Sequence, residues 1–447
     1  MRDRPLRIAF AAYRGNMRCG GQGVYLWFLA RELARLGHEV HVYVGPPHPD
    51  PMPFAARVTE IGNDHHWARW FLNDWGSLLG RPGALRVFQP LRFYELFWSW
   101  FGFLPEPLAF SLRALSAIRA DLRRGQRFDL VHDVQCLGFG LLWLRAAGVP
   151  VVSTVHHPLS VDRRASFARA QTLSEAIGTM TFYPIGMQSH VARRLDRVFT
   201  SSQASAREIA RDFGVDPARL RMVANGVDTE LFRPDPEQPR AERELLCVGR
   251  ASDPNKGLGT LIDALAALPR DVRLTLVDDA SGENGAVKRA RARGIGERVD
   301  LVGRVSSERL IELYRRAALV VVPSRYEGFG LPAAEALACG TPVVATRAGA
   351  LPEVVGDCGV LVPADDPHAL AAGIQQLLDA PARRAEMAAR GRRRIAELYS
   401  WPRVAAATAE VYAELASRRG SGAASGRPTS STTSASPGSL RASASSP

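Results

Sequence analysis

The sequence predicts an α/β protein made of two doubly wound, Rossmann-like domains that face each other across a cleft. Three observations support this class. The chain has 447 residues, which is more than one hydrophobic core usually serves. Short β-rich runs alternate with helical runs, a pattern typical of a parallel sheet with crossover helices. The pattern is interrupted at residues 231–244 by three prolines and several charges, and then begins again.

The first domain is expected over residues 1–230. Its predicted strands cover 6–13, 39–45, 129–134, 150–156 and 197–202, and an amphipathic helix covers 24–36. An insertion at about 65–110 stands apart, because 67–104 holds five of the eight tryptophans, mixed with arginines. It is interpreted either as a helical insertion that packs on its own domain or as a membrane-interface surface, where Trp and Arg lie at headgroup level.

The second domain is expected over residues 244–398. Its predicted strands cover 244–250, 273–279, 299–305, 318–324 and 342–346, with helices over 259–267, 331–338 and 368–378. A helix over 399–418 is expected to pack back toward the first domain. The remaining segment, 419–447, is rich in Ser, Ala, Gly and Pro and is expected to be a disordered tail. Ligands of parallel sheets bind at the carboxyl ends of the strands, so the site is expected in the cleft.

Hydropathy and cysteine usage indicate a cytoplasmic protein. No run reaches the roughly 18–20 apolar residues that span a bilayer. The first predicted strand is short for a signal peptide. The five cysteines are scattered, without a CxxC or Cys/His cluster, so neither a disulfide framework nor a structural zinc site is expected.

The basic residues are almost all arginines. The net charge of +12 comes from 57 basic and 45 acidic residues, and since only Lys256 and Lys288 are lysines, 57 − 2 leaves 55 arginines. A lysine kept where arginine is the rule indicates a need for a compact ammonium group. A basic surface favours anionic partners. Nucleic acid is not among the expected partners, because the arginines are dispersed along the chain rather than clustered.

A glycine-rich segment, Gly20-Gly21-Gln22-Gly23, lies between the first predicted strand and the first helix. Such glycines let backbone N–H groups approach an anion at a helix N-terminus, although a simple tight turn has the same composition. The spacing differs from the six-residue dinucleotide fingerprint, and no acidic residue ends the second strand. A dinucleotide cofactor is therefore not expected.

Two cations follow the first strand of the second domain. Arg250 ends that strand, and Lys256 lies six positions later, before a helix. Two fixed cations at the mouth of a parallel sheet suit a diphosphate. The alternative is a pair of solvated surface charges.

Two carboxylates lie eight positions apart in the segment 324–335. Glu327 lies on a glycine-rich loop after a predicted strand, and Glu335 lies in the first or second turn of the next helix. Pro332 suits the first turn of that helix, where a missing N–H costs no hydrogen bond. One acid is thus expected to face what lies above the loop, and the other to face what lies beside the helix start.

As an ordered set, these motifs resemble the retaining nucleotide-sugar glycosyltransferases of family 4, which have the GT-B fold. The segments that carry the resemblance are 20–42, 224–232, 248–257, 327–335, 338–346 and 351–367. The likeness covers roughly residues 1–415, with a gap across about 50–125. It implies that the first domain binds the acceptor and the second the nucleotide-sugar.

The resemblance also implies a role for each matching residue. Arg250 and Lys256 would bind the donor's diphosphate, Glu327 the hydroxyls of the transferred sugar, and His156 would lie over the reacting sugar. Glu335 would hold the ribose. The implied donor-binding set is Gly20, Gly21, Arg250, Lys256, Glu327, Gly328, Phe329, Gly330, Leu331 and Glu335, and the implied catalytic set is His156, Glu327, Arg250 and Lys256. Which of His156 and His157 faces the cleft is left open.

The implied reaction keeps the anomeric configuration. Front-face displacement is favoured over a covalent adduct, because a carboxylate bonded to sugar hydroxyls is badly placed for the anomeric carbon. No metal is expected, since Asp278 and Asp279 are adjacent in a predicted strand and point to opposite faces. No cofactor is expected either; a UDP- or GDP-sugar would be the substrate. Asp278 stands where the family usually has glycine, which leaves the base open.

Other functions remain as alternatives. A GT-B sugar-nucleotide epimerase or phosphorylase shares the fold, but neither lysine has the context of a pyridoxal-phosphate site. A non-catalytic sugar-nucleotide-binding scaffold is the third. As a hexosyltransferase, the protein would act on a glycan, a lipid-linked sugar or another hydroxyl, in cell-envelope polysaccharide synthesis. The tryptophan-rich insertion favours an enzyme that is peripheral on the inner face of an anionic membrane over one with a soluble acceptor.

Overall fold

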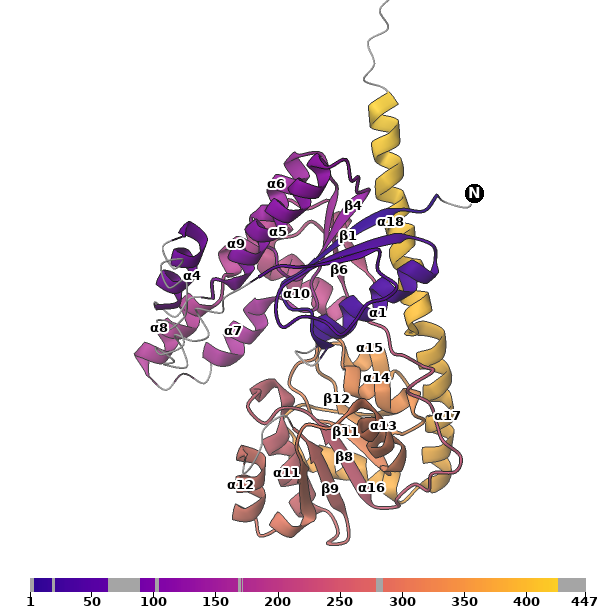
Figure 1. The fold of residues 1–447 in the computed structure, drawn as a ribbon. Helices are drawn as coiled ribbons and strands as arrows, with labels where there is room; N and C mark the ends of the chain where they lie inside the picture. The colour runs from indigo at the N-terminus through magenta and orange to yellow at the C-terminus, as the bar shows by residue number, and fades with distance from the viewer. Residues whose placement is uncertain are drawn as a thin grey trace, which may run out of the picture.

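The computed structural model describes residues 4–17, 21–62, 89–100, 104–167, 170, 172–278 and 284–424. Two α/β domains lie one above the other (Figure 1). In the described residues, each domain is built on one parallel sheet. The first sheet has the order β3-β2-β1-β4-β5-β6-β7, and the second has the order β10-β9-β8-β11-β12-β13.

The strands of the first sheet are β1 (Arg7–Ala12), β2 (Glu39–Val44), β3 (Arg57–Glu60), β4 (Leu130–Val134), β5 (Val151–Thr154), β6 (Arg197–Thr200) and β7 (Leu220–Met222). The helices of this domain are α1 (Gly21–Arg35), α4 (Pro90–Trp100), α5 (Glu106–Arg123), α6 (Gly140–Ala146), α7 (Leu159–Phe167), α8 (Leu173–Phe182), α9 (Ile185–Ala192) and α10 (Gln203–Phe213). The predicted strands and first helix are therefore present, whereas β3 and β7 were not predicted.

The strands of the second sheet are β8 (Glu244–Val248), β9 (Arg273–Val277), β10 (Val299–Val302), β11 (Leu319–Val322), β12 (Val343–Thr346) and β13 (Gly359–Val362). Its helices are α11 (Leu258–Ala267), α12 (Gly285–Ala292), α13 (Ser307–Arg316), α14 (Leu331–Ala338), α15 (Leu351–Val355), α16 (Pro367–Leu378) and α17 (Pro381–Leu398). Four of the strands, β8, β9, β10 and β11, end earlier than predicted, β12 ends at Thr346 as predicted, and β13 was not predicted. As a result Arg250 lies in the loop after β8, beyond the end of the strand at Val248.

Apolar runs explain why these strands are central. In β1, alternate side chains enter different cores: Ile8 and Phe10 pack against α1, whereas Ala9 and Ala11 pack on the opposite face near Phe110. A strand buried on both faces needs apolar residues at successive positions, and β1 has them. Loops that follow β1, β4 and β5 at their carboxyl ends face the other domain across a cavity.

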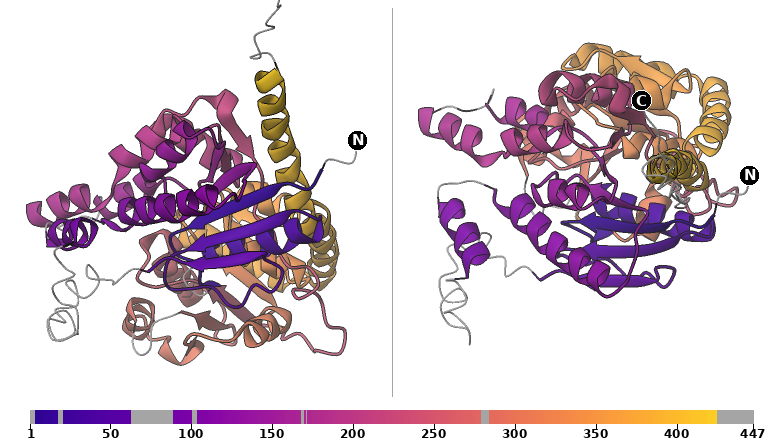
Figure 2. Two further views of the ribbon diagram at one scale, coloured as in Figure 1. Left: turned by 45° about the horizontal axis from the view of Figure 1, so that its top comes forward. Right: turned by 90° about the horizontal axis from the view of Figure 1, so that it is seen from above.

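The last helix, α18 (Trp401–Ala424), follows α17 of the second domain and packs on the first domain (Figure 2). Trp401 and Tyr412 belong to the same buried cluster as β1 and α1. The helix extends to Ala424, so the predicted boundary at 418 and the predicted disorder of 419–424 are wrong. No proline occurs in this stretch before Pro428 to stop the helix. The remaining tail, 425–447, lies outside the described residues.

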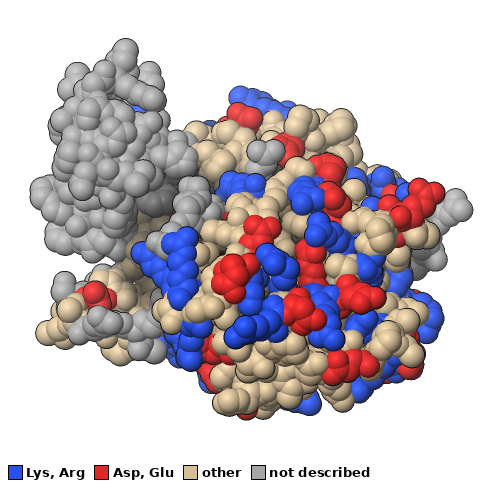
Figure 3. Space-filling view, turned by 90° about the horizontal axis from the view of Figure 1, so that it is seen from below, with Lys and Arg blue, Asp and Glu red and all other residues tan. Residues whose placement is uncertain are grey.

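Two predicted surface features can be followed only in part. The insertion is described as α4 and the start of α5, whereas 63–88 and 101–103 lie outside the described residues. On the face seen in Figure 3, Lys and Arg side chains alternate with Asp and Glu side chains and form no single basic patch. Within the described residues, no helix is both long and apolar enough to cross a membrane.

Candidate active site

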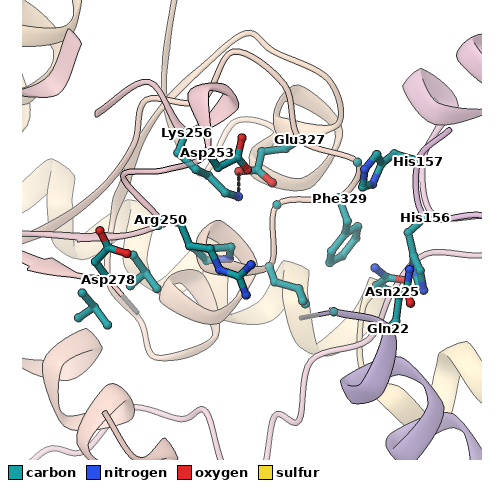
Figure 4. Close-up of a pocket in the computed structure, with 18 of the residues that line it drawn as sticks. Gln22, His156, His157, Asn225, Arg250, Asp253, Lys256, Asp278, Glu327 and Phe329 are labelled. Carbon is teal, nitrogen blue, oxygen red and sulfur yellow. Dashed lines mark hydrogen bonds and ion pairs between the residues drawn. The ribbon is translucent and has the colours of Figure 1, made fainter. Parts of the chain in front are cut away.

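A cavity of about 580 Å³ lies between the two domains (Figure 4). It is bounded by loops at the carboxyl ends of β1, β4 and β5 on one side and of β8, β9 and β11 on the other. Of the residues singled out in the sequence, the cavity is lined by Gly21, His156, His157, Arg250, Lys256, Asp278, Glu327, Gly328, Phe329, Gly330 and Leu331. Gly20 lies outside the described residues. The structure thus brings together groups that are up to 310 positions apart in sequence (331 − 21).

Lys256 and Glu327 form an ion pair on the second-domain wall. The Nζ of Lys256 lies 2.7 Å from the Oε1 of Glu327, and the Ser324 hydroxyl donates to the same oxygen at 2.8 Å. Burial alone would lower the pKa of Lys256, but the adjacent Glu327 carboxylate outweighs it and raises this pKa above its ordinary value. Lys256 is therefore a fixed cation at neutral pH.

A short 3-10 turn holds Lys256 in this place. Asp253 caps the turn Pro254–Lys256 by accepting a hydrogen bond from the Asn255 amide at 2.9 Å. Gly257 then adopts φ +63°, and a Cβ there would come within 2.0 Å of the Pro323 carbonyl oxygen. Only glycine permits this close approach of the Lys256 turn to the end of β11, so the glycine brings cation and carboxylate together.

Arg250 lies in the loop that follows β8, and its side chain extends into the cavity (Figure 4). The residue is exposed, whereas the side chain of Lys256 is half-buried. A guanidinium group offers a planar fork of donors to phosphate oxygens, whereas an ammonium acts as a point charge. Arg250 and Lys256 therefore offer a phosphate two different kinds of contact from the same wall.

His156 faces the cavity from the end of β5. In the part of the chain that the structure describes, neither of its buried ring nitrogens has a hydrogen-bond partner, although Asn225 lies beside it (Figure 4). The ring packs edge-on against Tyr25, with centroids 4.9 Å apart. Burial lowers the pKa of His156 to about 3, and the neighbouring His157 adds to the decrease. His156 is thus neutral and lines the cavity beside Asn225.

His157 is engaged elsewhere. Its Nε2 lies 2.9 Å from the Asp162 carboxylate in α7. Burial would lower the pKa of His157, but the hydrogen bond and charge of Asp162 raise it above its ordinary value. Both histidines line the cavity, and of the two it is His157 that is bonded to a carboxylate.

Glu335 differs from its sequence-based expectation. It is the fifth residue of α14, it is not among the cavity-lining residues, and its carboxylate accepts a hydrogen bond from the Tyr314 hydroxyl at 2.8 Å. Burial raises the pKa of Glu335 to about 7 despite that hydrogen bond. The side chain therefore points toward α13 in this arrangement, and its contact with a ribose stays a prediction.

Sequence reasoning missed several polar residues of the first-domain wall. Gln135 follows β4 with φ +55°, and its Oε1 accepts a hydrogen bond from the His156 amide at 2.9 Å. Arg14 donates to the buried Glu106 carboxylate at 2.7 Å. The missed wall residues are Tyr13, Arg14 and Gln135, whereas Gln22 and Asn225 lie in segments singled out in the sequence but were given no role. A usable signal was their position, since several of them directly follow predicted strands.

Asp278 is buried at the end of β9 and braces neighbouring loops. It accepts hydrogen bonds from the Ala251 amide at 3.0 Å and from the Asn284 side chain at 2.8 Å. Asp279 lies outside the described residues. Among the residues that the structure describes, no group of three or more His, Cys, Asp or Glu side chains is arranged to hold a metal ion.

Two facing parallel sheets with a cation-bearing cavity between them are the architecture of the GT-B fold. Residues 19–231 match the family described as Glycosyltransferase Family 4, and residues 228–394 match the family described as Glycosyl transferases group 1. The chain belongs to glycosyltransferase family 4.

Relatives match over nearly the whole chain. The MMP alpha-(1->4)-mannosyltransferase of Mycolicibacterium hassiacum is 40% identical over 424 residues, covering 92% of this chain and 99% of its own. A D-inositol 3-phosphate glycosyltransferase of Xylanimonas cellulosilytica is 33% identical, covering 91% of this chain and 94% of its own. Such likeness supports a nucleotide-sugar glycosyltransferase.

Solved structures share the fold. Sucrose-phosphate synthase of Thermosynechococcus elongatus superposes with a TM-score of 0.69 at 25% identity, covering 92% of this chain and 100% of its own. An Anabaena protein in complex with UDP and glucose superposes with a TM-score of 0.66 at 21% identity, with the same coverage. The likeness to the Anabaena protein establishes the fold alone.

Proposed function

We propose that the protein is a retaining hexosyltransferase that moves a sugar from a nucleoside-diphosphate donor to a hydroxyl of a saccharide acceptor, without a metal ion. The observation that carries this proposal is the Lys256–Glu327 pair beside Arg250 on one wall of the cavity. Cations and a carboxylate side by side suit a ligand that has phosphates at one end and hydroxyls at the other.

Charge stabilisation is the main catalytic contribution in this proposal. As the bond between the anomeric carbon and the diphosphate oxygen breaks, negative charge grows on the diphosphate. Arg250 and Lys256 would stabilise that charge in place of a metal ion. Losing one such preorganised contact typically raises a barrier by roughly 3–4 kcal/mol.

Glu327 would orient the sugar rather than attack it. Its Oε1 already accepts hydrogen bonds from Lys256 and Ser324, so this oxygen is a poor nucleophile. His156, neutral and facing the same space, would bond another sugar hydroxyl. The acceptor oxygen would then attack from the face that the diphosphate leaves, and its proton would pass to the departing phosphate oxygen. Retention of configuration follows from this geometry.

The similarity to the Mycolicibacterium hassiacum relative supports a narrower form of the proposal. That protein is named an alpha-(1->4)-mannosyltransferase and is 40% identical. We therefore infer that this chain forms an α-linked product on a saccharide acceptor, with a mannosyl donor as the first candidate. For the acceptor there are two candidates, a soluble saccharide and one at a membrane surface. The second is motivated by α4, which exposes Phe93, Phe97 and Trp98.

A donor screen tests the function. UDP- and GDP-sugars are added to the purified full chain, and melting is followed with and without each donor. A donor present at one hundred times its Kd adds about 2.7 kcal/mol of stability, which a thermal shift detects. The anomeric configuration of the product is then read by NMR. An inverted product, a covalent adduct on Glu327, or loss of activity in EDTA would each contradict the proposed mechanism.

A co-sedimentation experiment distinguishes the two acceptor classes. The chain is mixed at low salt with vesicles that contain anionic lipid and, separately, with neutral vesicles. Binding to the anionic vesicles alone would favour a membrane acceptor. Failure to bind either would favour a soluble saccharide.

A further inference from the structure

The N-terminus of α10 in the first domain meets the Glu327 loop of the second domain. Ser202 is the N-cap of α10, and its hydroxyl oxygen accepts a hydrogen bond from the Ser205 amide at 3.0 Å. The same hydroxyl donates to the carbonyl oxygen of Gly328 at 2.9 Å, and the Ser201 hydroxyl donates to that oxygen at 3.0 Å. The residue next to Glu327 is thus held by hydroxyl groups of the other domain.

A second contact joins the same helix end to the second domain. The Glu353 carboxylate, from α15, accepts hydrogen bonds from the Gln203 amide at 2.8 Å and from the Ala204 amide at 2.9 Å. The first amides of a helix lack partners within the helix, and a carboxylate there is also favoured by the helix dipole. Glu353 therefore caps a helix that belongs to the other domain.

The α15 segment is tied back to Glu327. The Ala350 amide donates to the Glu327 carbonyl oxygen at 2.9 Å. Gly349 adopts φ +55°, and a Cβ there would lie 2.2 Å from the same oxygen. Only glycine lets the two backbones come this close, so the position of α15 depends directly on that of Glu327.

These contacts form a closed ring that crosses the domain boundary twice. From Gly328 it passes through Ser202 to α10, through Glu353 to α15, and through Ala350 back to Glu327. The chain also passes between the domains in two covalent segments. These segments form a parallel β-bridge with each other at Val227 and Ser400. That bridge would keep the domains joined if the ring opened.

We propose that Ser202 and Glu353 are positioning residues of the transfer reaction: the hydrogen-bond ring that they complete holds the domains closed and aligns Glu327 with the donor sugar. This inference rests on the proposed function. Loss of the Glu353 carboxylate leaves two helix amides without partners and frees α15, so the Glu327 loop loses its fixed relation to the first domain. Neither residue lines the cavity, so neither touches the donor directly.

The test compares Glu353→Ala with Glu353→Gln and Ser202→Ala. Glu308→Ala is the matched control, because Glu308 also lies in the first turn of a second-domain helix, α13. For Glu353→Ala, kcat/KM for the donor should fall roughly ten-fold or more, since small misplacement of reacting groups is costly. The radius of gyration from small-angle scattering should rise as closed molecules become fewer. Glu353→Gln keeps one acceptor oxygen and should lose less; Glu308→Ala should match wild type.

Binding of UDP and GDP alone separates positioning from general damage. Apart from Gly20 and Gly21, the proposed donor-binding groups belong to the second domain, so the Kd of the wild-type-preferred nucleotide should change less than about two-fold in Glu353→Ala. Unchanged kcat/KM and radius of gyration would overturn the inference. If Glu353→Ala loses nucleotide affinity and melting temperature together with kcat/KM, the inference is overturned too, because such general losses indicate a structural role. If wild type transfers no sugar, the proposed function fails, and scattering alone then decides whether the ring holds the domains closed.

Discussion

The two walls of the cavity differ in charge and in how their side chains are held. The second-domain wall carries three cations and three carboxylates, on loops that follow strands: Arg250, Lys256, Arg304, Asp253, Asp278 and Glu327. On the first-domain wall, the cation Arg14 is paired with the buried Glu106, and His156 is neutral. Charged side chains are therefore concentrated on the second-domain wall, where the proposed diphosphate would lie. Neutral polar groups prevail on the first-domain wall, where the proposed acceptor would enter.

The largest expected effect concerns Lys256. In Lys256→Ala, kcat should fall roughly a thousand-fold, because a preorganised contact worth about 3–4 kcal/mol is lost and Glu327 loses its counterion. Steady-state kinetics at saturating donor measure this. Lys288→Ala is the matched control, since Lys288 is the only other lysine and lies exposed on α12. A kcat of Lys256→Ala within ten-fold of the wild-type value would contradict the proposed role of the second-domain cations.

Arg250 should matter next. Arg250→Ala is expected to lower kcat/KM for the donor roughly ten- to hundred-fold, because hydrogen bonds to a charged group contribute about 1.5–3 kcal/mol. Varying the donor concentration at fixed acceptor measures it. Arg270→Ala is a suitable control, because Arg270 is exposed just before β9, at the opposite end of the sheet from the cavity. Equal activity of the two variants would contradict the proposed role.

On the first-domain wall, His156 and His157 are expected to differ in their effect on kcat. His156→Ala should reduce kcat about ten-fold, more than His157→Ala, because the ring of His157 is already bonded to Asp162. With the pKa of His156 lowered to about 3, protonation of this ring should not reduce activity between pH 5 and 8. A pH–rate profile of wild type and His157→Ala checks this. A fall near pH 6 that persists in His157→Ala and disappears in His156→Ala would refute it.

The smallest expected effect concerns Glu335 and stability. Its folded-state pKa is raised to about 7 by burial, above the ordinary value of 4.5, so its contribution to stability is full below pH 4.5 and is lost as the pH rises through 7. Glu335→Gln should therefore melt about 1–3 °C above wild type at pH 8 and show no gain at pH 4.5. Melting curves of the ligand-free protein measure the difference.

The exposed Glu386, on α17, provides the control for that experiment. Glu386→Gln should show no gain that depends on pH. If the two variants behave alike, the carboxylate of Glu335 is not held in a buried environment. The contrast between a buried and an exposed glutamate then disappears.

The sequence predicted the second-domain wall better than the first. Lys256 and Glu327 lie in short motifs between a strand and a helix, so local pattern was enough to bring them to one sheet edge. Gln135 directly follows a predicted strand and Asn225 lies in the segment 224–232, but a polar residue in a loop reads the same whether or not it faces a cavity. The fold class followed from the strand alternation, whereas short edge strands such as β3 and β7 carry too few apolar residues to be recognised.

The sequence pattern also did not predict the direction of the Glu335 side chain. The position of Glu335 on its helix was expected, but the carboxylate turns to Tyr314, which lies 21 positions earlier on α13. Such a contact depends on how two helices pack, not on the spacing of residues within one of them. The helix over 399–418 was predicted to return to the first domain, and α18 does so, although its end at Ala424 was not foreseen.

The path of α18 has a consequence for biosynthesis. Trp401 and Tyr412 fill the same core as β1 and α1, and the ring of Trp401 stacks on Phe28 with centroids 5.4 Å apart. The first domain leaves the ribosome early, yet the residues that seal one of its cores are translated about 400 positions later. Domains usually fold in order as they emerge. Here the nascent first domain would have to wait, with an apolar groove exposed, until the end of the chain arrives to close it.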